Sequence, residues 1–328
     1  MSNKLISVII PIFNAEETLK KCIESIINQS IHDYKIYLIN DGSTDNTENI
    51  LSKYNEEKNI RIINKNNEGA SETRNFALKL VDTPFVVFMD ADDYVEKTYL
   101  EHLIYAIKDH NADMAVTGII RKTKKEENIT KFKEKTLASK EMITEILKEN
   151  GPGGYLWNKI FNTNVIKKYN IRFDPNINMA EDLLFCVQYL LHSKKVFISK
   201  ECDYHYVQLN GSLSSGVSIF NTNRNYKKAY LDYIMSLQKI KSILPPDLTI
   251  SRKLINERLC HISCDFLRTM KLNHSKDYKL YSKIRNIAIN NRKLTLRSNN
   301  LTRKQKLYLN LVIWFPNGIY FLDKIRFR

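Results

Sequence analysis

The first 95 residues alternate short apolar runs with longer segments in which apolar residues recur every three or four positions. Continuous apolar runs are typical of buried strands, and the longer spacing is typical of helices. The pattern predicts strands over about 5–12, 34–39, 60–63 and 85–89, and helices over about 14–28, 46–54 and 71–80. Strands that alternate with such helices form a mainly parallel sheet with helices on both faces. We therefore expect an α/β, Rossmann-like domain.

The pattern is less regular after residue 95. It predicts a helix to about 110, a strand over 113–120, a hairpin or loop over 121–135, a helix over 181–192, and strands over 196–199 and 203–207. From residue 221 onward we expect helices over about 221–243 and 250–270, with shorter basic segments to the end. We divide the chain into an α/β domain over 1–220, with halves 1–95 and 96–220, and a helical region over 221–328.

Three acids, Asp90, Asp92 and Asp93, follow the fourth predicted strand. Carboxylates this close raise one another's pKa, so a cation is expected among them. Hard oxygen ligands, with no Cys or His beside them, suit Mg²⁺ or Mn²⁺. The alternative is that these acids only cap the helix that follows.

Polar residues also follow the other predicted strands. Asn14, Asp41 and Arg74 are expected at the carboxyl ends of the strands together with the three acids, and ligands of parallel sheets bind at those ends. Asn14, with Glu17 three residues later, is also a candidate cap for the first helix. No Gly-x-Gly-x-x-Gly and no Walker A motif follows a predicted strand. The usual dinucleotide and P-loop phosphate sites are therefore excluded.

Four motifs occur in order along this half: Ser-Val-Ile-Ile-Pro-Ile-Phe-Asn over 7–14, Ile-Asn-Asp-Gly-Ser-Thr-Asp over 39–45, Asn-Glu-Gly-Ala-Ser-Glu-Thr-Arg-Asn over 67–75, and Met-Asp-Ala-Asp-Asp over 89–93. Together they resemble the successive motifs of family 2 glycosyltransferases with a GT-A fold, as in bacterial enzymes that make cell-surface polysaccharides. The resemblance extends less sharply to about Ser214. It implies a nucleotide-sugar donor such as a UDP-sugar, a divalent metal, and inversion at the anomeric carbon.

The resemblance also implies roles for individual residues. Asp41 would hold the uracil or ribose, Arg74 would lie beside the base and diphosphate, Asp90 would contact the ribose, and Asp92 would bind the metal. Asn40 replaces the first acid of the commoner Asp-Asp-Gly-Ser form, so we expect it to matter less. Asp93 is either a helix cap or a support for a metal ligand. The expected donor-binding residues are Pro11, Phe13, Asn14, Asp41, Arg74, Asp90, Ala91 and Asp92.

A glycine-rich segment, Gly151-Pro152-Gly153-Gly154, lies shortly before Trp157. Glycines permit close backbone approach to a ligand, and an indole offers a flat face on which a sugar or base can stack. The alternative is a turn before a helix, with Trp157 in the core. The resemblance favours an acceptor-side role for Trp157, Asn158 and Lys159.

Glu181 and Asp182 stand at the start of a predicted apolar helix. The helix dipole alone would explain two acids there. Inverting transfer, however, needs a base that takes the proton of the acceptor hydroxyl, which a metal ion cannot do. The pair matches the Glu-Asp motif of the family, and we predict Asp182 as the base, with Glu181 as the alternative.

The segment Tyr204-His205-Tyr206 is predicted as a strand, which places His205 on the face opposite to the two tyrosines. In similar proteins this segment, together with residues such as Ser212 to Ser214, closes over the diphosphate. His205 either completes the metal shell or is a hydrogen-bonded structural histidine. Both interpretations stay open here.

Charge is unevenly distributed. The chain has a net charge of +15, and residues 251–328 hold 18 Lys and Arg against four acids, or +14. This asymmetry favours a polyanionic partner, although a solvated helical face would also explain it. The longest apolar stretch, 307–322, is interrupted and too short to span a bilayer, and no signal peptide is evident at the start. We expect a cytoplasmic protein with reduced cysteines, docked on the inner face of the membrane through its basic region.

The resulting hypothesis is a metal-dependent, inverting hexosyl- or N-acetylhexosaminyltransferase acting on a glycan or polyprenyl-linked acceptor. A nucleic-acid-binding protein and an inactive membrane-associated scaffold are the alternatives. No zinc-finger or RNA-recognition motif is visible, so no nucleic acid is expected, and the intact acid and Arg74 motifs argue against lost activity. A homo-oligomer is left open.

Overall fold

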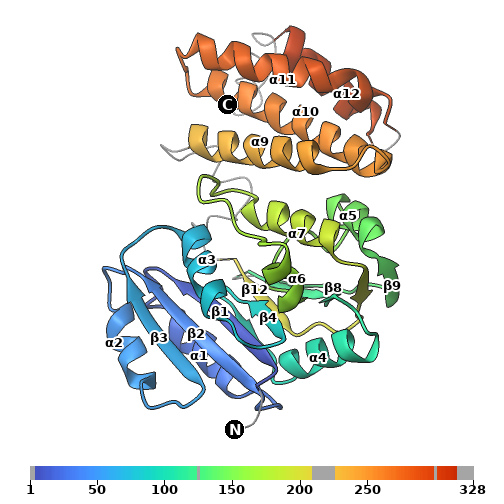
Figure 1. The fold of residues 1–328 in the computed structure, drawn as a ribbon. Coiled ribbons are helices and arrows are strands. Elements are labelled where there is room, and N and C mark those ends of the chain that lie inside the picture. The colour runs from blue at the N-terminus through green and yellow to red at the C-terminus, as the bar shows by residue number, and fades with distance from the viewer. Residues whose placement is uncertain (1–3, 124–125, 209–225, 299–300, 316–328) are drawn as a thin grey trace. The chain divides into compact units, whose positions relative to one another are not determined.

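The computed structural model describes residues 4–123, 126–208, 226–298 and 301–315. Contacts divide the chain into two compact units, Met1–Ser212 and Leu213–Arg328, which we call the α/β unit and the helical unit (Figure 1). The predicted boundary near residue 220 and the segment from Ser212 to Ser214 lie outside the described residues.

The first half of the α/β unit agrees with the prediction. Its strands are β1 (Ile6–Ile12), β2 (Tyr34–Asp41), β3 (Ile60–Lys65) and β4 (Phe85–Phe88), and its helices are α1 (Leu19–Ile27), α2 (Thr47–Leu51), the 3₁₀ turn Ser52–Tyr54, and α3 (Ala70–Leu80). Among themselves these four strands pair in parallel, in the order β3-β2-β1-β4. Successive residues Val8, Ile9 and Ile10 of β1 are all buried, as expected for a strand covered on both faces.

Four further strands extend the same sheet past β4, in the order β10 (Lys159–Asn162), β6 (Met114–Val116), β11 (Lys195–Ile198) and β9 (Lys135–Ala138). β10 runs antiparallel to both of its neighbours, so this side of the sheet is mixed. The helices of this half are α4 (Tyr99–Asp109), α5 (Ser139–Leu147), α6 (Thr163–Lys168) and α7 (Glu181–His192). The sheet is therefore mainly, but not wholly, parallel.

A second sheet of the α/β unit has the order β5-β12-β7-β8, formed by β5 (Tyr94–Val95), β12 (Tyr204–Val207), β7 (Ile119–Lys122) and β8 (Glu127–Thr130). The hairpin of β7 and β8 confirms one of the two predictions for 121–135. The single strand predicted over 113–120 is wrong, because the chain leaves the large sheet after β6 and enters the small one as β7. Gly118 lies at this crossing, where a Cβ atom would stand 2.2 Å from Cys202 Sγ.

Two predicted helix starts are also wrong. α1 begins at Leu19 rather than near Asn14. Asn14 instead has a positive φ of 48°, and its side-chain oxygen accepts a hydrogen bond from the Thr44 amide at 2.8 Å. Asn14 thus ties the end of β1 to the loop after β2. The second is the helix that was expected to follow Tyr94 and to end near residue 110: α4 begins at Tyr99, and Tyr94 and Val95 form β5 instead.

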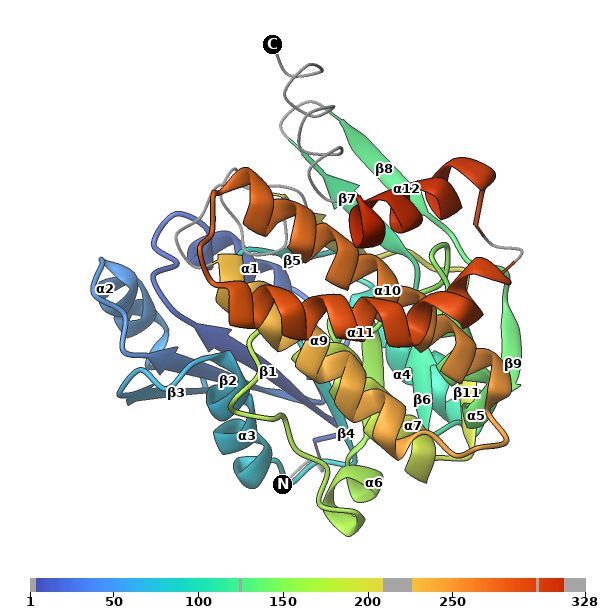
Figure 2. The same cartoon turned by 90° about the horizontal axis from the view of Figure 1, so that it is seen from above.

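The described part of the helical unit contains α9 (Tyr226–Ile243), α10 (Thr249–Leu272), α11 (Tyr278–Leu296) and α12 (Arg303–Trp314). The two long helices are confirmed, and the shorter basic segments are helical as well. α10 packs against the other three helices, which Figure 2 shows from above. Three contacts illustrate this packing: the Tyr230 and Phe266 rings stack at 4.6 Å, Thr295 Oγ1 donates to the Asn256 carbonyl, and Tyr308 donates to Asp265.

The remaining sequence-based expectations on the fold concern cysteines and membrane spans. All five cysteines are unpaired; four are buried, and Cys202 is partly exposed. Among the described residues, no helix combines the length and the apolar character that crossing a membrane requires.

Candidate active site

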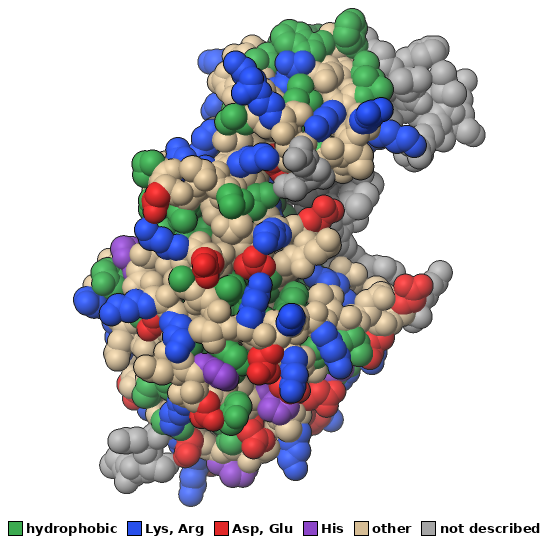
Figure 3. Space-filling model, turned by 90° about the vertical axis from the view of Figure 1, so that its right-hand side faces the viewer, with side chains coloured by type: hydrophobic (Ala, Val, Ile, Leu, Met, Phe, Trp, Pro, Cys, Tyr) green, Lys and Arg blue, Asp and Glu red, His purple; other side chains and the backbone are tan. Residues whose placement is uncertain are grey.

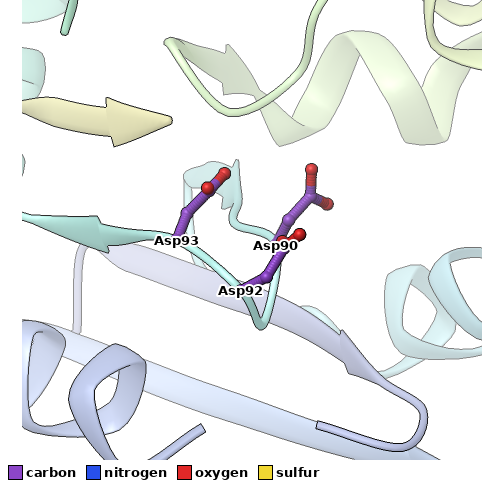
Figure 4. A group of neighbouring side chains, drawn as sticks. All are labelled: Asp90, Asp92 and Asp93. Atoms are coloured by element: carbon purple, nitrogen blue, oxygen red, sulfur yellow. The ribbon is translucent and has the colours of Figure 1, made fainter. Parts of the chain in front are cut away.

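The three acids after β4 form one cluster. Single carboxylate oxygens of Asp90, Asp92 and Asp93 lie within 4.8 Å of one another, and Figure 4 shows the three carboxylates directed toward the same side of the loop. Burial, followed by the charge of Asp90, raises the pKa of Asp92 to about 6. Burial likewise raises the pKa of Asp93 well above its usual range. Ionised carboxylates crowded in this way are stabilised by a cation, and three hard oxygen ligands fit Mg²⁺ or Mn²⁺.

Asp93 links this cluster to β12. Its two carboxylate oxygens accept hydrogen bonds from the Tyr204 hydroxyl at 2.7 Å and from the Val207 amide at 2.8 Å. The prediction that Asp93 caps a helix is wrong, since the residue before α4 is Thr98. Asp93 thus supports the loop that carries Asp90 and Asp92 and fixes the segment that follows in the small sheet.

Arg74, on α3, connects the acid cluster to the start of α7. Its Nη2 lies 3.1 Å from Asp90 Oδ1, and its Nη1 lies 3.0 Å from Glu181 Oε1. The guanidinium is buried, and its Nε is a buried donor that has no hydrogen-bond partner among the described residues. The Arg74 guanidinium therefore joins Asp90, a predicted ligand of the nucleotide sugar, to the helix that carries the predicted base. Its Nε–H remains available to donate a further hydrogen bond.

The start of α7 holds the two acids of the Glu-Asp pair. Ala180, just before the helix, has a φ of 60°, a left-handed conformation that costs free energy for a residue with a Cβ atom. Asp182 Oδ1 accepts a hydrogen bond from the Leu183 amide at 2.6 Å. Burial, followed by the charge of Glu181, raises the pKa of Asp182 to about 7. A carboxylate that titrates near neutral pH is suited to general-base chemistry.

Asp41 ends β2 and holds the loop between β3 and α3. Its oxygens accept hydrogen bonds from Lys65 Nζ at 2.6 Å, the Glu68 amide at 3.0 Å and the Gly69 amide at 2.8 Å. Burial acts to raise the pKa of Asp41, but these hydrogen bonds outweigh it and lower the pKa below its usual value. Asp41 therefore stays ionised at the end of β2. Asn40 also bridges loops, since it donates to Asn64 and accepts from the Ser43 amide.

The other predicted donor-binding residues lie at the same edge of the sheet. Pro11 lies near the end of β1, and Phe13 follows β1 with 52% of its surface exposed. The carbonyl of Ala91, between the cluster acids, accepts a hydrogen bond from Thr18. The structure thus brings these residues to the ends of the strands, as predicted.

Trp157, Asn158 and Lys159 are all buried. Trp157 stacks on Tyr155 at 5.0 Å and on Tyr204 at 4.6 Å. Lys159 Nζ donates to the carbonyls of Gly153 and Tyr155 and to Asn158 Oδ1 at 2.9, 2.6 and 2.8 Å. Burial lowers the pKa of Lys159 to about 8. These buried residues stabilise the glycine-rich loop by stacking and by hydrogen bonds to its carbonyls. Their acceptor-side role stays a prediction.

His205 pairs with a carboxylate other than those of the cluster. Its Nε2 lies 2.6 Å from Glu96 Oε1, and its ring stacks on Tyr94 at 4.3 Å. These contacts fit the structural interpretation of His205. Its role as a metal ligand stays a prediction.

Sequence reasoning missed three residues that shape this site. Lys65 pairs with Asp41, Tyr204 donates to Asp93, and Tyr155, which stacks on Trp157, is 38% exposed. Strand register would have revealed the first of them, since Asp41 and Lys65 are direct neighbours on β2 and β3.

The sequence over residues 7–170 matches the model of the glycosyl transferase family 2. The chain belongs to this family. It is 32% identical to the cholesterol galactosyltransferase of Borreliella burgdorferi over 232 residues, which cover 67% of this chain and 64% of that protein. It is 31% identical to the poly(ribitol-phosphate) β-N-acetylglucosaminyltransferase TarP of Staphylococcus aureus over 253 residues, or 72% of this chain and 75% of TarP. The chain thus spans slightly less than two thirds of the length of the first of these relatives.

Solved structures confirm the GT-A fold. S. aureus TarS 1-349 in complex with UDP superposes with a TM-score of 0.61 at 20% identity, covering 89% of this chain and 90% of that one. The mannosyltransferase PcManGT of Pyrobaculum calidifontis, in complex with GDP-Man and Mn²⁺, superposes with a TM-score of 0.53 at 13% identity, covering 94% and 85%. The α/β prediction is therefore confirmed at the level of the GT-A fold.

Proposed function

We propose that this family 2 protein is a metal-dependent, inverting glycosyltransferase. It would move a hexosyl or N-acetylhexosaminyl group from a UDP-sugar to a hydroxyl of a glycan or polyprenyl-linked acceptor during cell-surface polysaccharide synthesis. The observation that carries the proposal is the pair of contacts from Arg74 to Asp90 and to Glu181. They join the donor side of the crevice to the helix that carries Asp182. The UDP and sugar specificities named for relatives support the donor class.

In this proposal, the donor lies along the ends of β1, β2 and β4. The ionised Asp41 accepts hydrogen bonds from the base or ribose, while Phe13 and Asn14 border the base. Arg74 faces the diphosphate, because its buried Nε still lacks an acceptor among the described residues and phosphate oxygens are good acceptors for a guanidinium. Asp90, which pairs with Arg74, would also contact the ribose of the donor.

Asp92, with Asp90 and Asp93 beside it, would hold Mg²⁺ or Mn²⁺. The cation would neutralise negative charge that develops on the departing nucleoside diphosphate. Asp93 keeps the loop in place through Tyr204 and Val207. The Mn²⁺ named for PcManGT supports this assignment.

Asp182 is the proposed base. As the acceptor oxygen bonds to the anomeric carbon, the bond from that carbon to the diphosphate breaks, and the hydroxyl proton passes to a carboxylate oxygen of Asp182. Attack on the side opposite to the leaving group inverts the anomeric centre. Glu181 is less suited to this role because Arg74 already occupies one of its oxygens. The acceptor would lie against the loop of Gly153 to Trp157, with Tyr155 as the partly exposed ring.

A panel of nucleotide sugars tests the proposal. The full chain is screened for thermal stabilisation and donor hydrolysis with Mn²⁺, with Mg²⁺ and with chelator. At least one UDP-sugar should stabilise the protein and be hydrolysed only when the cation is present, and adding the cation back after chelation should restore hydrolysis. Full activity in chelator would contradict the metal assignment, and indifference to every UDP-sugar would contradict the donor class.

The variant Asp92→Asn tests whether the metal binds at this site. It should fold normally but lose the cation-dependent part of donor binding and hydrolysis. The matched control is Asp109→Asn, which removes an exposed carboxylate at the end of α4. Equal behaviour of the two variants would show that Asp92 is not a metal ligand.

A further inference from the structure

The last two described helices carry positive charge without any acid. The sequence from Tyr278 to Phe315 contains nine Lys and Arg and no Asp or Glu. On the face seen in Figure 3, blue Lys and Arg side chains are frequent on the helical unit, whereas most of the red Asp and Glu side chains belong to the α/β unit. On α11 the exposed positions 279, 283, 286, 290, 293 and 297 recur at helical spacing and so share one face. Four of them are basic: Lys279, Lys283, Lys293 and Arg297.

Large apolar side chains are exposed on the same two helices. Leu307, Trp314 and Phe315, within or directly after α12, are 59%, 47% and 65% exposed, and Leu294 on α11 is 48% exposed. A soluble polyanion would account for the basic residues but not for leucine, phenylalanine and tryptophan left in water beside them. The boundary between lipid headgroups and acyl chains accommodates both kinds of side chain.

Two arginines of α11 hold the end of α12 in place. Arg285 Nε donates to the Ile313 carbonyl at 2.9 Å, and Arg292 Nε donates to Asn310 Oδ1 at 2.6 Å. Their guanidinium carbons lie 5.1 and 5.9 Å from the centre of the Trp314 ring. The indole is therefore ordered before any partner arrives, which lowers the entropic cost of binding. Tryptophan is also the side chain most typical of membrane interfaces, together with tyrosine.

We propose that α11 and α12 form a surface that binds anionic lipid, with Leu307, Trp314 and Phe315 entering the headgroup boundary and the lysines and arginines facing lipid phosphates. This surface would hold the enzyme on the cytoplasmic membrane, where a polyprenyl-linked acceptor is found. The access to a polyprenyl-linked acceptor rests on the proposed function, but lipid binding itself does not.

Trp314 is a built-in reporter for the test. The chain has two tryptophans, and Trp157 is buried in the α/β unit. In a Trp157→Phe variant of the full chain, Trp314 fluorescence should shift to shorter wavelength on vesicles of phosphatidylcholine with phosphatidylglycerol, and acyl-brominated lipid should quench it. Vesicles of phosphatidylcholine alone should have a much smaller effect, and salt should reverse binding. If Trp157→Phe fails to fold, co-sedimentation of the unaltered chain with the same vesicles gives the answer.

Matched variants locate the surface. Lys283→Gln with Lys293→Gln should weaken vesicle binding roughly tenfold or more. The control pair Lys53→Gln with Lys58→Gln removes the same charge from exposed positions in the 3₁₀ turn Ser52–Tyr54 and just before β3 and should leave binding unchanged. Trp314→Ala with Phe315→Ala should weaken binding although no charge is lost. Equal binding by all of these variants would overturn the proposal.

Other partners give different results. Equal affinity for inorganic polyphosphate, without quenching by brominated lipid, would replace the lipid surface with a polyanion site. A blue shift that depends on protein concentration in the absence of vesicles would make this face a contact between copies of the chain. Donor hydrolysis without vesicles should be unchanged in the lysine variants. If the protein binds vesicles but uses no nucleotide-sugar donor, the proposed glycosyltransferase activity is wrong and the proposed lipid-binding surface is still supported.

Discussion

The two units use positive charge in opposite ways. The α/β unit buries Arg74 and Lys159, which are 7% and 0% exposed, whereas every described Lys and Arg of the helical unit is at least partly exposed. Burying a cation costs several kcal/mol unless it is well paired or hydrogen-bonded, while an exposed one costs little. The buried cations therefore indicate where the fold is constrained by its chemistry, and the exposed ones indicate where a partner can be attracted. Each prediction below tests one side of this contrast.

The largest effect is expected at the proposed base. Asp182→Asn should lower sugar transfer by roughly 10²–10⁴-fold, the usual contribution of general-base catalysis, while donor and Mn²⁺ binding persist. Initial rates and donor affinity, measured on the same preparation, check this. Glu181→Gln is the matched variant and should mainly weaken donor binding, because it removes a partner of Arg74. If Glu181→Gln abolishes transfer and Asp182→Asn does not, Glu181 is the base.

The next effect concerns the buried lysine. Lys159→Met should lower the free energy of unfolding of the α/β unit by about 3 kcal/mol, because two buried carbonyls and an amide oxygen lose their donor. Lys283→Gln, on the exposed face of α11, should change stability by less than about 0.5 kcal/mol. Urea unfolding followed through Trp157 fluorescence in a Trp314→Phe background reports on the α/β unit. Equal urea midpoints for Lys159→Met and its parent would mean that the hydrogen bonds of the buried ammonium do not stabilise the α/β unit.

The smallest effect is a pH dependence. Burial raises the pKa of Asp182 to about 7 in the folded protein, whereas an aspartate in an unfolded chain has a pKa of about 3.9. Between these values the folded state binds more protons than the unfolded state, so this group lowers stability as pH rises through the interval. Asp182→Asn should therefore be more stable than the unaltered chain at pH 8, by on the order of 1–2 kcal/mol, and no different near pH 4. Thermal melts across this range decide it, and a gain that does not vary with pH would contradict the assignment.

The first half of the α/β unit could be predicted from the sequence because its strands are covered on both faces. Such strands are apolar along their whole length, so β1, β2 and β4 stand out from the helices between them. The second half gives weaker signals. Only alternate residues of β9 are partly buried, and β9 was missed together with α5. Between β6 and β7, Gly118 has no room for a Cβ atom because of Cys202, which is distant in the sequence.

The sequence motifs identified most residues of the candidate site but not the side chains that pair with them. They indicated Arg74 and the acids, but the pairing of Asp41 with Lys65 follows from strand register, and the hydrogen bond from Tyr204 to Asp93 joins residues that are distant in the sequence. Lys159 could not be predicted as a core residue, since lysine is almost never fully buried. Its place follows from the carbonyls that the glycine-rich loop turns inward.

The contacts of Arg74 have a consequence for protein engineering. Asp90, Arg74 and Glu181 come from three separate segments, and Glu181 belongs to the second half of the α/β unit. A chimaera that joined residues 1–95 to a foreign second half without a carboxylate at position 181 would leave a buried guanidinium half-paired, at a cost of about 3–5 kcal/mol. Recombination at the middle of the α/β unit is therefore compatible only with partners that bring their own acid to the start of α7.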